Sequence, residues 1–213
     1  MNFDDFYQQA LKIKNLPLPG ADSHYKMAPE VRTQLLKSKN FKYQNPKKAG
    51  VMALFYPDLR HTTHLLLILR NAYPGVHSNQ IGFPGGKMEI HDKDLLHTAL
   101  REAREEVGLR PENVEVIREL TDLYIPPSNF MVTPFLALGK APQRFVPDKT
   151  EVEALVEVPL DEYLNDGNLI QQKLSTSYAQ NIDVPAFKLK GYVVWGATAM
   201  MLSEIRELLR QVL

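Results

Sequence analysis

Three glutamates lie close together in the chain, at Glu102, Glu105 and Glu106, and carboxylates so spaced can hold a divalent cation. An α-helix turns by about 100° per residue, so this spacing would put all three side chains on one helix face. Like charges repel there, and a hard cation such as Mg²⁺ or Mn²⁺ relieves the repulsion. The cation could bridge phosphate oxygens and make a bound water more acidic. The sequence therefore predicts a Mg²⁺ or Mn²⁺ site.

The helix that carries the glutamates is expected over residues 94–107, with Gly108 just past its end as a common C-cap residue. It would display the carboxylates on one side and pack its apolar side on a sheet. The apolar positions are Leu96, Leu100, Ala103 and Val107. Arg101 precedes the cluster and can pair with one of the glutamates to orient it. The pair Gly85-Gly86 permits a close approach of the backbone beside the site.

Taken alone, the run Arg101–Glu106 is more typical of a solvated helix face with ion pairs such as Arg101 with Glu105. The glycine loop before it, the terminating Gly108 and the apolar opposite face favour the metal site. The stretch also resembles the Nudix box, a glycine followed by spaced acidic residues and then R-E-apolar-x-E-E-x-G-apolar. The matching residues are Gly86, Arg101, Glu102, Ala103, Glu105, Glu106, Gly108 and Leu109.

The box departs from its commonest form in the spacing from Gly86 to Arg101, which is longer by one residue, and its intermediate acidic position is Asp92 or Glu89. The longer spacing occurs in the coenzyme A diphosphatase branch of the family. The resemblance implies an α/β fold, the Nudix α/β/α sandwich with a mixed sheet. It implies that Glu102, Glu105 and Glu106 bind the metal together with Gly86, and that Arg101 belongs to the catalytic set.

The base that activates water would be one of the box glutamates or a later glutamate. Glu151 and Glu153 are the downstream candidates, and for each a plain polar position at the start of a strand is the simpler interpretation.

The segment LLILRNAYPGVHSNQIGFPGG resembles the motif that precedes the box in coenzyme A diphosphatases. From it we predict substrate contacts at Arg70, His77, Gln80 and Phe83. The segment departs from that motif at Asn71, Gly75 and Asn79. An arginine is expected at Gly75, and a guanidinium suits the extra phosphate of coenzyme A. Arg70 or a lysine of Lys47–Lys48 could compensate.

Further matches extend this resemblance from about Ala49 to Leu202, through IPPSNFMVTPFLA, VEVPL and WGATAMML. The first expected function is therefore metal-dependent hydrolysis of coenzyme A or acyl-coenzyme A to 3′,5′-ADP and a 4′-phosphopantetheine. Gly75 keeps open a hydrolase of ADP-ribose or another nucleoside diphosphate derivative. A non-catalytic nucleotide sensor is a third alternative, although its acidic positions are usually eroded. Isopentenyl diphosphate isomerase shares the fold but depends on a cysteine, and this chain has none.

The rest of the chain must position this site. We expect an N-terminal helical extension over residues 1–45 and a Nudix domain over 46–213. The expected helices span residues 2–14, 29–36 and 197–212, with a short helical turn near Leu160. The expected strands span residues 49–56, 63–69, 114–120, 130–138, 152–158 and 186–194. Residues 71–86 should be largely loop, with a brief extended piece at 80–83.

Composition limits the partners. Basic and acidic residues number 25 each, so no basic surplus points to nucleic acid, and a small-molecule nucleoside diphosphate derivative is the expected partner. No apolar run is long enough for a membrane, and the start does not resemble a signal peptide, so cytoplasm is expected. A homodimer is an open expectation.

His61 and His64 are expected at the surface. Trp195 should pack in the core, with stacking on a base as the alternative.

Overall fold

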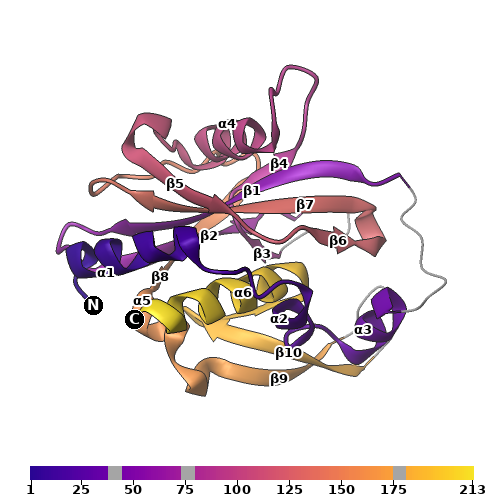
Figure 1. Cartoon of the computed structure of the whole chain (residues 1–213). Helices are drawn as coiled ribbons and strands as arrows, with labels where there is room; N and C mark the ends of the chain where they lie inside the picture. Colours follow the sequence, from indigo (N-terminus) through magenta and orange to yellow (C-terminus); the bar gives the residue numbers. More distant parts are fainter. Residues whose placement is uncertain (38–44, 73–79, 175–180) are drawn as a thin grey trace.

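The computed structural model describes residues 1–37, 45–72, 80–174 and 181–213. Figure 1 shows helix α4 (Leu95–Val107) above an eight-stranded sheet, and helix α6 (Gly196–Val212) between that sheet and a smaller, three-stranded one. Helix α1 (Phe3–Ala10) lies on the same side of the large sheet as α6 (Figure 1). The predicted sandwich of helices around a mixed sheet is confirmed, with a second small sheet outside it.

The large sheet is mixed because β1 (Lys47–Pro57) runs parallel to β7 (Phe130–Gly139), while its other pairings are antiparallel. The strand order is β3-β2-β1-β7-β5, with β4, β6 and β8 paired to β1, β7 and β2. The remaining strands are β2 (Thr63–Arg70), β3 (Ile81–Gly82), β4 (Gly85–Lys87), β5 (Val114–Glu119), β6 (Leu123–Ile125) and β8 (Val152–Pro159).

The glycine loop is built into this sheet. β1 and β2 pair where Phe55–Pro57 meets Thr63–Leu65. Further along, β3 pairs with β2 and β4 pairs with β1, so residues 81–87 occupy the space between the two longer strands. Gly86 faces Gly50 across the β1–β4 ladder. The expected loop thus holds two short strands, and the box begins inside the sheet, beneath α4.

Helix α4 rests directly on β1 at Gly50. A Cβ atom on Gly50 would lie 2.2 Å from the carbonyl oxygen of Leu95, so only glycine allows this approach. The helix begins at the N-cap Asp94, whose carboxylate accepts the backbone N–H of His97 at 2.7 Å. It ends at Gly108, which has the left-handed conformation with φ 68°. Both predicted ends of this helix are confirmed.

The N-terminal helices share the core with α6. Phe6, Ala10 and Ile13 are fully buried beside Ile205 and Leu208 of α6. After α1 come a 3₁₀ turn (Leu11–Asn15), α2 (Ala21–Tyr25) and α3 (Glu30–Lys37). The division of the chain at residues 45 and 46 stays a prediction.

The prediction of one strand over residues 186–194 was wrong. This segment is a hairpin of β10 (Ile182–Leu189) and β11 (Tyr192–Trp195), and β9 (Leu169–Leu174) pairs with β10 on its other side. Lys190 and Gly191 form the turn with φ of 52° and 83°. The five other predicted strands and the C-terminal helix are confirmed, with ends shifted by no more than two residues. The helical turn near Leu160 is α5 (Leu160–Leu164).

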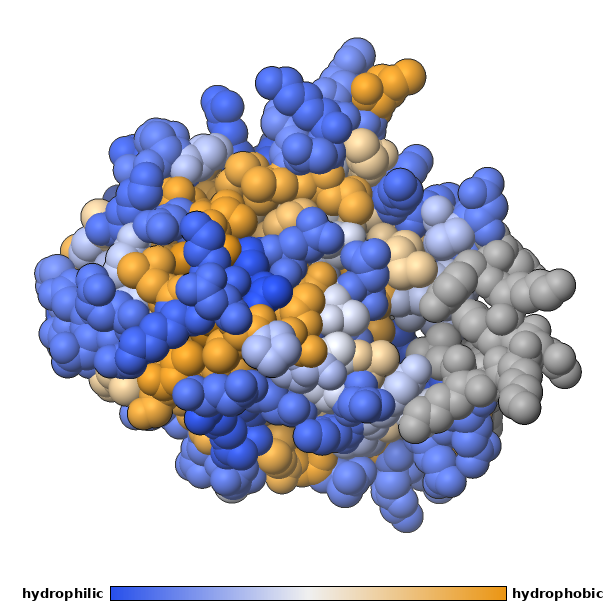
Figure 2. Space-filling view, viewed as in Figure 1, coloured by the Kyte–Doolittle hydropathy of each residue, from blue (hydrophilic) through white to orange (hydrophobic). Residues whose placement is uncertain are grey.

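Among the described residues, no helix is both long enough and apolar enough to cross a membrane. On the face shown in Figure 2, apolar patches are interrupted by hydrophilic side chains, the usual mixture for a protein surface. The homodimer stays a prediction.

Candidate active site

Glu106 is buried, with 1% of its side chain exposed, and is not displayed on an open helix face as expected. Its Oε2 accepts the backbone N–H of Gly85 at 2.8 Å, and its Oε1 lies 3.0 Å from Nη1 of Arg70. Nη2 of Arg70 donates to the carbonyl oxygen of Gly85 at 2.7 Å. Glu106 is buried because this side of α4 faces β4. The three residues form a closed ring of contacts that joins β2, β4 and α4.

The carboxylates at this place are crowded and poorly hydrated. Burial raises the pKa of Glu106 to about 7, and the charges of Glu102 and Glu151 add to the rise, against the opposing effect of Arg70. Burial also raises the pKa of Glu102, and the charge of Glu151 again contributes. Negative charge is therefore in excess here, which a divalent cation would relieve.

Glu102 lies against the backbone of Gly86 and is 16% exposed. A Cβ atom on Gly86 would lie 2.5 Å from the carboxyl carbon of Glu102 and equally close to one of its oxygens. The absent side chain of Gly86 therefore makes the space that this carboxylate fills. Gly86 and Glu102 are adjacent, as a shared metal site requires, and the role of Gly86 as a ligand stays a prediction.

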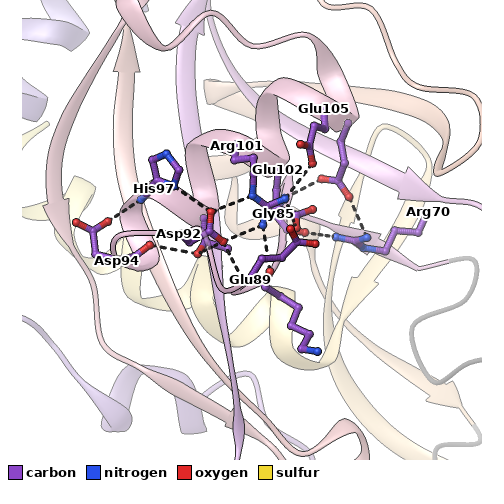
Figure 3. Close-up of polar contacts among 12 residues, drawn as sticks. Arg70, Gly85, Glu89, Asp92, Asp94, His97, Arg101, Glu102 and Glu105 are labelled. Atoms are coloured by element: carbon purple, nitrogen blue, oxygen red, sulfur yellow. Dashed lines mark hydrogen bonds and ion pairs between the residues drawn. The ribbon is translucent and has the colours of Figure 1, made fainter.

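Arg101 lies between Asp92 and the box glutamates (Figure 3). Its Nε and Nη2 donate to the two carboxylate oxygens of Asp92 at 3.0 and 2.9 Å. Its Nη1 lies 2.9 Å from Oε1 of Glu102 and 2.9 Å from Oε2 of Glu105. Arg101 thus orients two of the three glutamates. Glu105 itself is 59% exposed, so the three side chains differ widely in burial.

Asp92 is a site residue that the sequence patterns indicated only as an intermediate acidic position. It is 7% exposed and also accepts from the hydroxyl of Thr98 and the backbone N–H of Glu89, each at 2.9 Å. Its bidentate contact with Arg101 holds its pKa well below the usual range, despite burial. Its place nine residues before Arg101 marked it as a candidate acidic position of the box. The contact with Arg101 depends on the turn between β4 and α4, which brings the two side chains together.

The donor chemistry fits a divalent cation. Oε1 of Glu106 is buried and makes no hydrogen bond within the described part of the chain, its contact with Arg70 being an ion pair only. Glu102 and Glu105 add further hard oxygen donors. As the side chains stand, no group of three acidic or histidine residues among those described converges tightly enough to hold a metal. Glu105 is 59% exposed, so its carboxylate is the one of the three with most freedom to turn toward a cation.

Of the two candidate bases, Glu151 is the one whose charge raises the pKa of both Glu102 and Glu106. The backbone supports this placement: the N–H of Asp148 donates to the carbonyl oxygen of Glu106 at 2.9 Å, so the turn that carries Glu151 meets the end of α4. Glu153 is exposed on β8.

The predicted substrate residues fall in different places. Arg70 lies at the box through its contact with Glu106, and Gln80 lines a cavity together with Leu69 and Trp195. Phe83 is 2% exposed and belongs to the hydrophobic core that also contains Ile81. His77, like Gly75, lies outside the described residues.

Several other sequence expectations concern residues away from the box. Lys48 is exposed at the start of β1, and Nζ of Lys47 lies 5.7 Å from the centre of the Phe130 ring. His61 is exposed, while the partly buried His64 packs against the Tyr56 ring. Among the described residues, no contact joins Lys47 or Lys48 to the box glutamates.

The chain is similar to known proteins over most of its length. The sequence model for the NUDIX domain matches residues 46–178. The uncharacterized Nudix hydrolase NudL of Pectobacterium atrosepticum is 37% identical over 161 residues, which cover 72% of this chain and 79% of that protein. The mitochondrial coenzyme A diphosphatase NUDT8 of Homo sapiens is 32% identical over 146 residues, 68% of this chain and 62% of that protein. Against Nudix hydrolases 22 and 15 of Arabidopsis thaliana, the matched region spans about half of each, 53% and 56%.

Solved structures support the fold. The Nudix hydrolase RenU of M. smegmatis superposes with a TM-score of 0.54 at 19% identity, covering 79% of this chain and 88% of that one. A MutT/nudix family protein of Enterococcus faecalis gives 0.52 at 14% identity, covering 92% and 76%. The box geometry, the matching domain model and these relatives lead to one conclusion: the chain belongs to the Nudix hydrolase family.

Proposed function

We propose that the chain hydrolyses the diphosphate bond of coenzyme A or acyl-coenzyme A, giving 3′,5′-ADP and 4′-phosphopantetheine or its acyl form. The observation that carries this proposal is the contact of Arg70 with Glu106 and Gly85, at 3.0 and 2.7 Å. It ties a residue of the upstream coenzyme A diphosphatase motif to the box. The human relative, named a coenzyme A diphosphatase, supports the same substrate.

In the proposed reaction, the oxygen of a water molecule bonds to one phosphorus of the diphosphate. The bond from that phosphorus to the bridging oxygen breaks, the bridging oxygen leaves with the other phosphate, and a base takes the water proton. Mg²⁺ or Mn²⁺, held by Glu102, Glu105, Glu106 and the backbone of Gly86, would neutralise phosphate charge and make the water more acidic.

The protein's own contribution is to hold these oxygen donors in place before the substrate arrives. Arg101 orients Glu102 and Glu105, and Asp92 in turn fixes the plane of the Arg101 guanidinium. Arg70 keeps Glu106 against the glycine segment. Such supporting contacts reduce the reorganisation that the transition state would otherwise require.

For the base we propose Glu151, because its charge acts on both Glu102 and Glu106, and Glu153 is the second candidate. Glu151→Gln should lower kcat by about 100-fold or more with little change in KM, since proton transfer by a positioned group contributes on that scale. Glu153→Gln is the matched variant and should stay near the wild type. A large loss of kcat in Glu153→Gln with little loss in Glu151→Gln would instead assign the base to Glu153.

The second candidate function is hydrolysis of ADP-ribose or another nucleoside diphosphate derivative. Gly75, where the motif has an arginine, favours it, because that arginine suits the extra phosphate of coenzyme A.

A substrate comparison tests both functions. Coenzyme A, ADP-ribose and a diadenosine polyphosphate are incubated with Mg²⁺ or Mn²⁺ and either the wild type, Glu106→Gln or the surface control Glu112→Gln. We expect the highest kcat/KM for coenzyme A, its loss by more than about 100-fold in Glu106→Gln, and no change in the control. Faster cleavage of ADP-ribose would favour the second function. Binding without cleavage of any substrate would favour a nucleotide sensor.

A further inference from the structure

A cavity lies between the β2–β3 edge of the large sheet and β11 of the small one. Its volume is about 240 Å³, and it is lined by Leu69, Gln80, Ile81, Tyr192, Val193 and Trp195. None of these residues belongs to the box. The cavity therefore joins the upstream motif to a hairpin that the catalytic site does not use.

The cavity and the carboxylates use neighbouring residues of β2: Leu69 packs against the core on the α6 side, and Arg70 contacts Glu106 of α4. Leu69 lines it, and the next residue, Arg70, holds Glu106 at 3.0 Å. The backbone N–H of Arg70 also donates to the carbonyl oxygen of Gln80 at 3.1 Å. The register between β2 and β8 shifts between Leu69 and Arg70, and such irregularities re-aim side chains. A Cβ atom on Gly82 of β3 would lie 3.8 Å from Nε of Arg70 and 3.9 Å from Oγ1 of Thr198, so the Arg70 guanidinium and the first turn of α6 meet at β3.

The far wall of the cavity is firmly held. Thr198, in the first turn of α6, donates its hydroxyl to the carbonyl oxygen of Ile81 at 2.9 Å and is 8% exposed. Trp195 immediately precedes this helix and pairs with Ala186 across the β10–β11 ladder. Helix α6 and the hairpin therefore fix Trp195 relative to β3.

The lining suits a flat, uncharged ring. It holds two aromatic side chains, three aliphatic ones and one amide, and no charged residue is among the described side chains that form it. A phosphate would gain little there, because nothing in the lining offsets its charge. An aromatic base can stack on indole or phenol rings, whereas a linear pantetheine arm lacks a ring face to stack.

We propose that this cavity binds the base of the substrate's nucleotide half, with Trp195 stacking on it. The inference rests on the proposed function, in which the substrate is a nucleoside diphosphate derivative. The diphosphate then lies toward Arg70 and the box glutamates, and the other half of the substrate extends away from the cavity.

Trp195 gives a direct signal for this test, because the chain contains one tryptophan. Its fluorescence is followed while the full chain, with EDTA present, is titrated with 3′,5′-ADP or with 4′-phosphopantetheine. We expect a saturable change with 3′,5′-ADP and none with phosphopantetheine at the same concentrations. No change with 3′,5′-ADP, or an equal change with phosphopantetheine, would overturn the proposal.

A pair of variants makes the test independent of the fluorescence signal. Trp195→Leu removes the aromatic face and Trp195→Phe retains one, and thermal unfolding establishes that both are folded. Calorimetry should give a Kd for 3′,5′-ADP about 10-fold higher in Trp195→Leu and within about 3-fold of the wild type in Trp195→Phe. An unchanged Kd in folded Trp195→Leu would contradict the proposal.

The outcome also separates this inference from the proposed function. Hydrolysis of coenzyme A with an unchanged Kd in Trp195→Leu would refute the base site alone. Tight binding of 3′,5′-ADP at Trp195 without hydrolysis of coenzyme A would refute the proposed function alone.

Discussion

The guanidinium of Arg70 lies 3.0 Å from the buried carboxylate of Glu106 and 2.7 Å from the carbonyl oxygen of Gly85. The two contacts use different nitrogens of one planar group, a geometry that a lysine cannot reproduce. Arg70 therefore sets both the position of a box glutamate and the path of the glycine segment.

Replacing Arg70 tests this double contact. Arg70→Lys keeps the charge but loses one of the two contacts, so kcat should fall by about 10- to 100-fold, the usual cost of removing a residue that orients ligands. Arg70→Ala should cost more, because it leaves Glu106 without a charged partner. Steady-state kinetics with Mg²⁺ measures both, and full activity in Arg70→Lys would show that charge alone suffices.

Asp92 should act on catalysis only through Arg101. Asp92→Asn removes the charge that holds the guanidinium, so we expect kcat to fall by about 10- to 100-fold with a smaller change in KM. Asp94→Ala is a nearby control: it removes the N-cap of α4 and should lower stability by about 1 kcal/mol without this loss of kcat. Equal kcat in the two variants would contradict the positioning role of Asp92.

Two glycines allow a comparison of site and scaffold. A Cβ on Gly86 meets the movable end of the Glu102 side chain, so Gly86→Ala should fold normally and lose activity by about 100-fold. A Cβ on Gly50 meets the backbone of Leu95 at 2.2 Å, so Gly50→Ala should be destabilised by about 3 kcal/mol or more. Denaturant unfolding measures the stability of both variants, and steady-state kinetics measures their activity. Equal stability of Gly86→Ala and Gly50→Ala would contradict this prediction.

The lowered pKa of Glu204 predicts that the stability of the chain depends on pH. Burial raises its pKa, but hydrogen bonds from His24 and Thr121 outweigh this effect, so the net pKa is lowered in the folded chain. A lowered pKa means that the stabilisation is complete above the unfolded value, about 4.3, and is lost as the pH falls through the folded one. Glu204→Gln should therefore be less stable by about 2 kcal/mol at pH 7, and the difference should shrink below pH of about 4.

The control for this experiment is Glu207→Gln on the same helix. Glu207 pairs with Lys26, which is 64% exposed, so its removal should cost less than about 1 kcal/mol. Urea unfolding at several pH values measures both variants. A constant difference between wild type and Glu204→Gln across the acid range would contradict the account.

Helix α4 could be predicted from the sequence because local rules determine it. Its apolar period, the N-cap Asp94 and the left-handed Gly108 all act within a few residues. The burial of Glu106 could not be predicted in this way. A helical wheel gives its angle relative to Glu102, but the position of β4 beneath the helix decides which carboxylate is covered.

The misassigned segments have a similar explanation. β4 consists of Gly85–Lys87, which has no strand pattern and is extended because it pairs with β1. The apolar residues on both sides of Lys190-Gly191 looked continuous, although the turn there separates two strands. The partnership of Asp92 with Arg101 likewise depends on a turn whose shape the sequence does not state.

The most direct test of the proposed function identifies the products of coenzyme A hydrolysis in ¹⁸O-labelled water. With Mg²⁺ present, mass spectrometry should find 3′,5′-ADP and 4′-phosphopantetheine, with one ¹⁸O atom in only one of the two products. Glu106→Gln should yield neither product. Intact coenzyme A under conditions where ADP-ribose is cleaved would contradict the proposed substrate, and cleavage that Glu106→Gln leaves unchanged would contradict the proposed site.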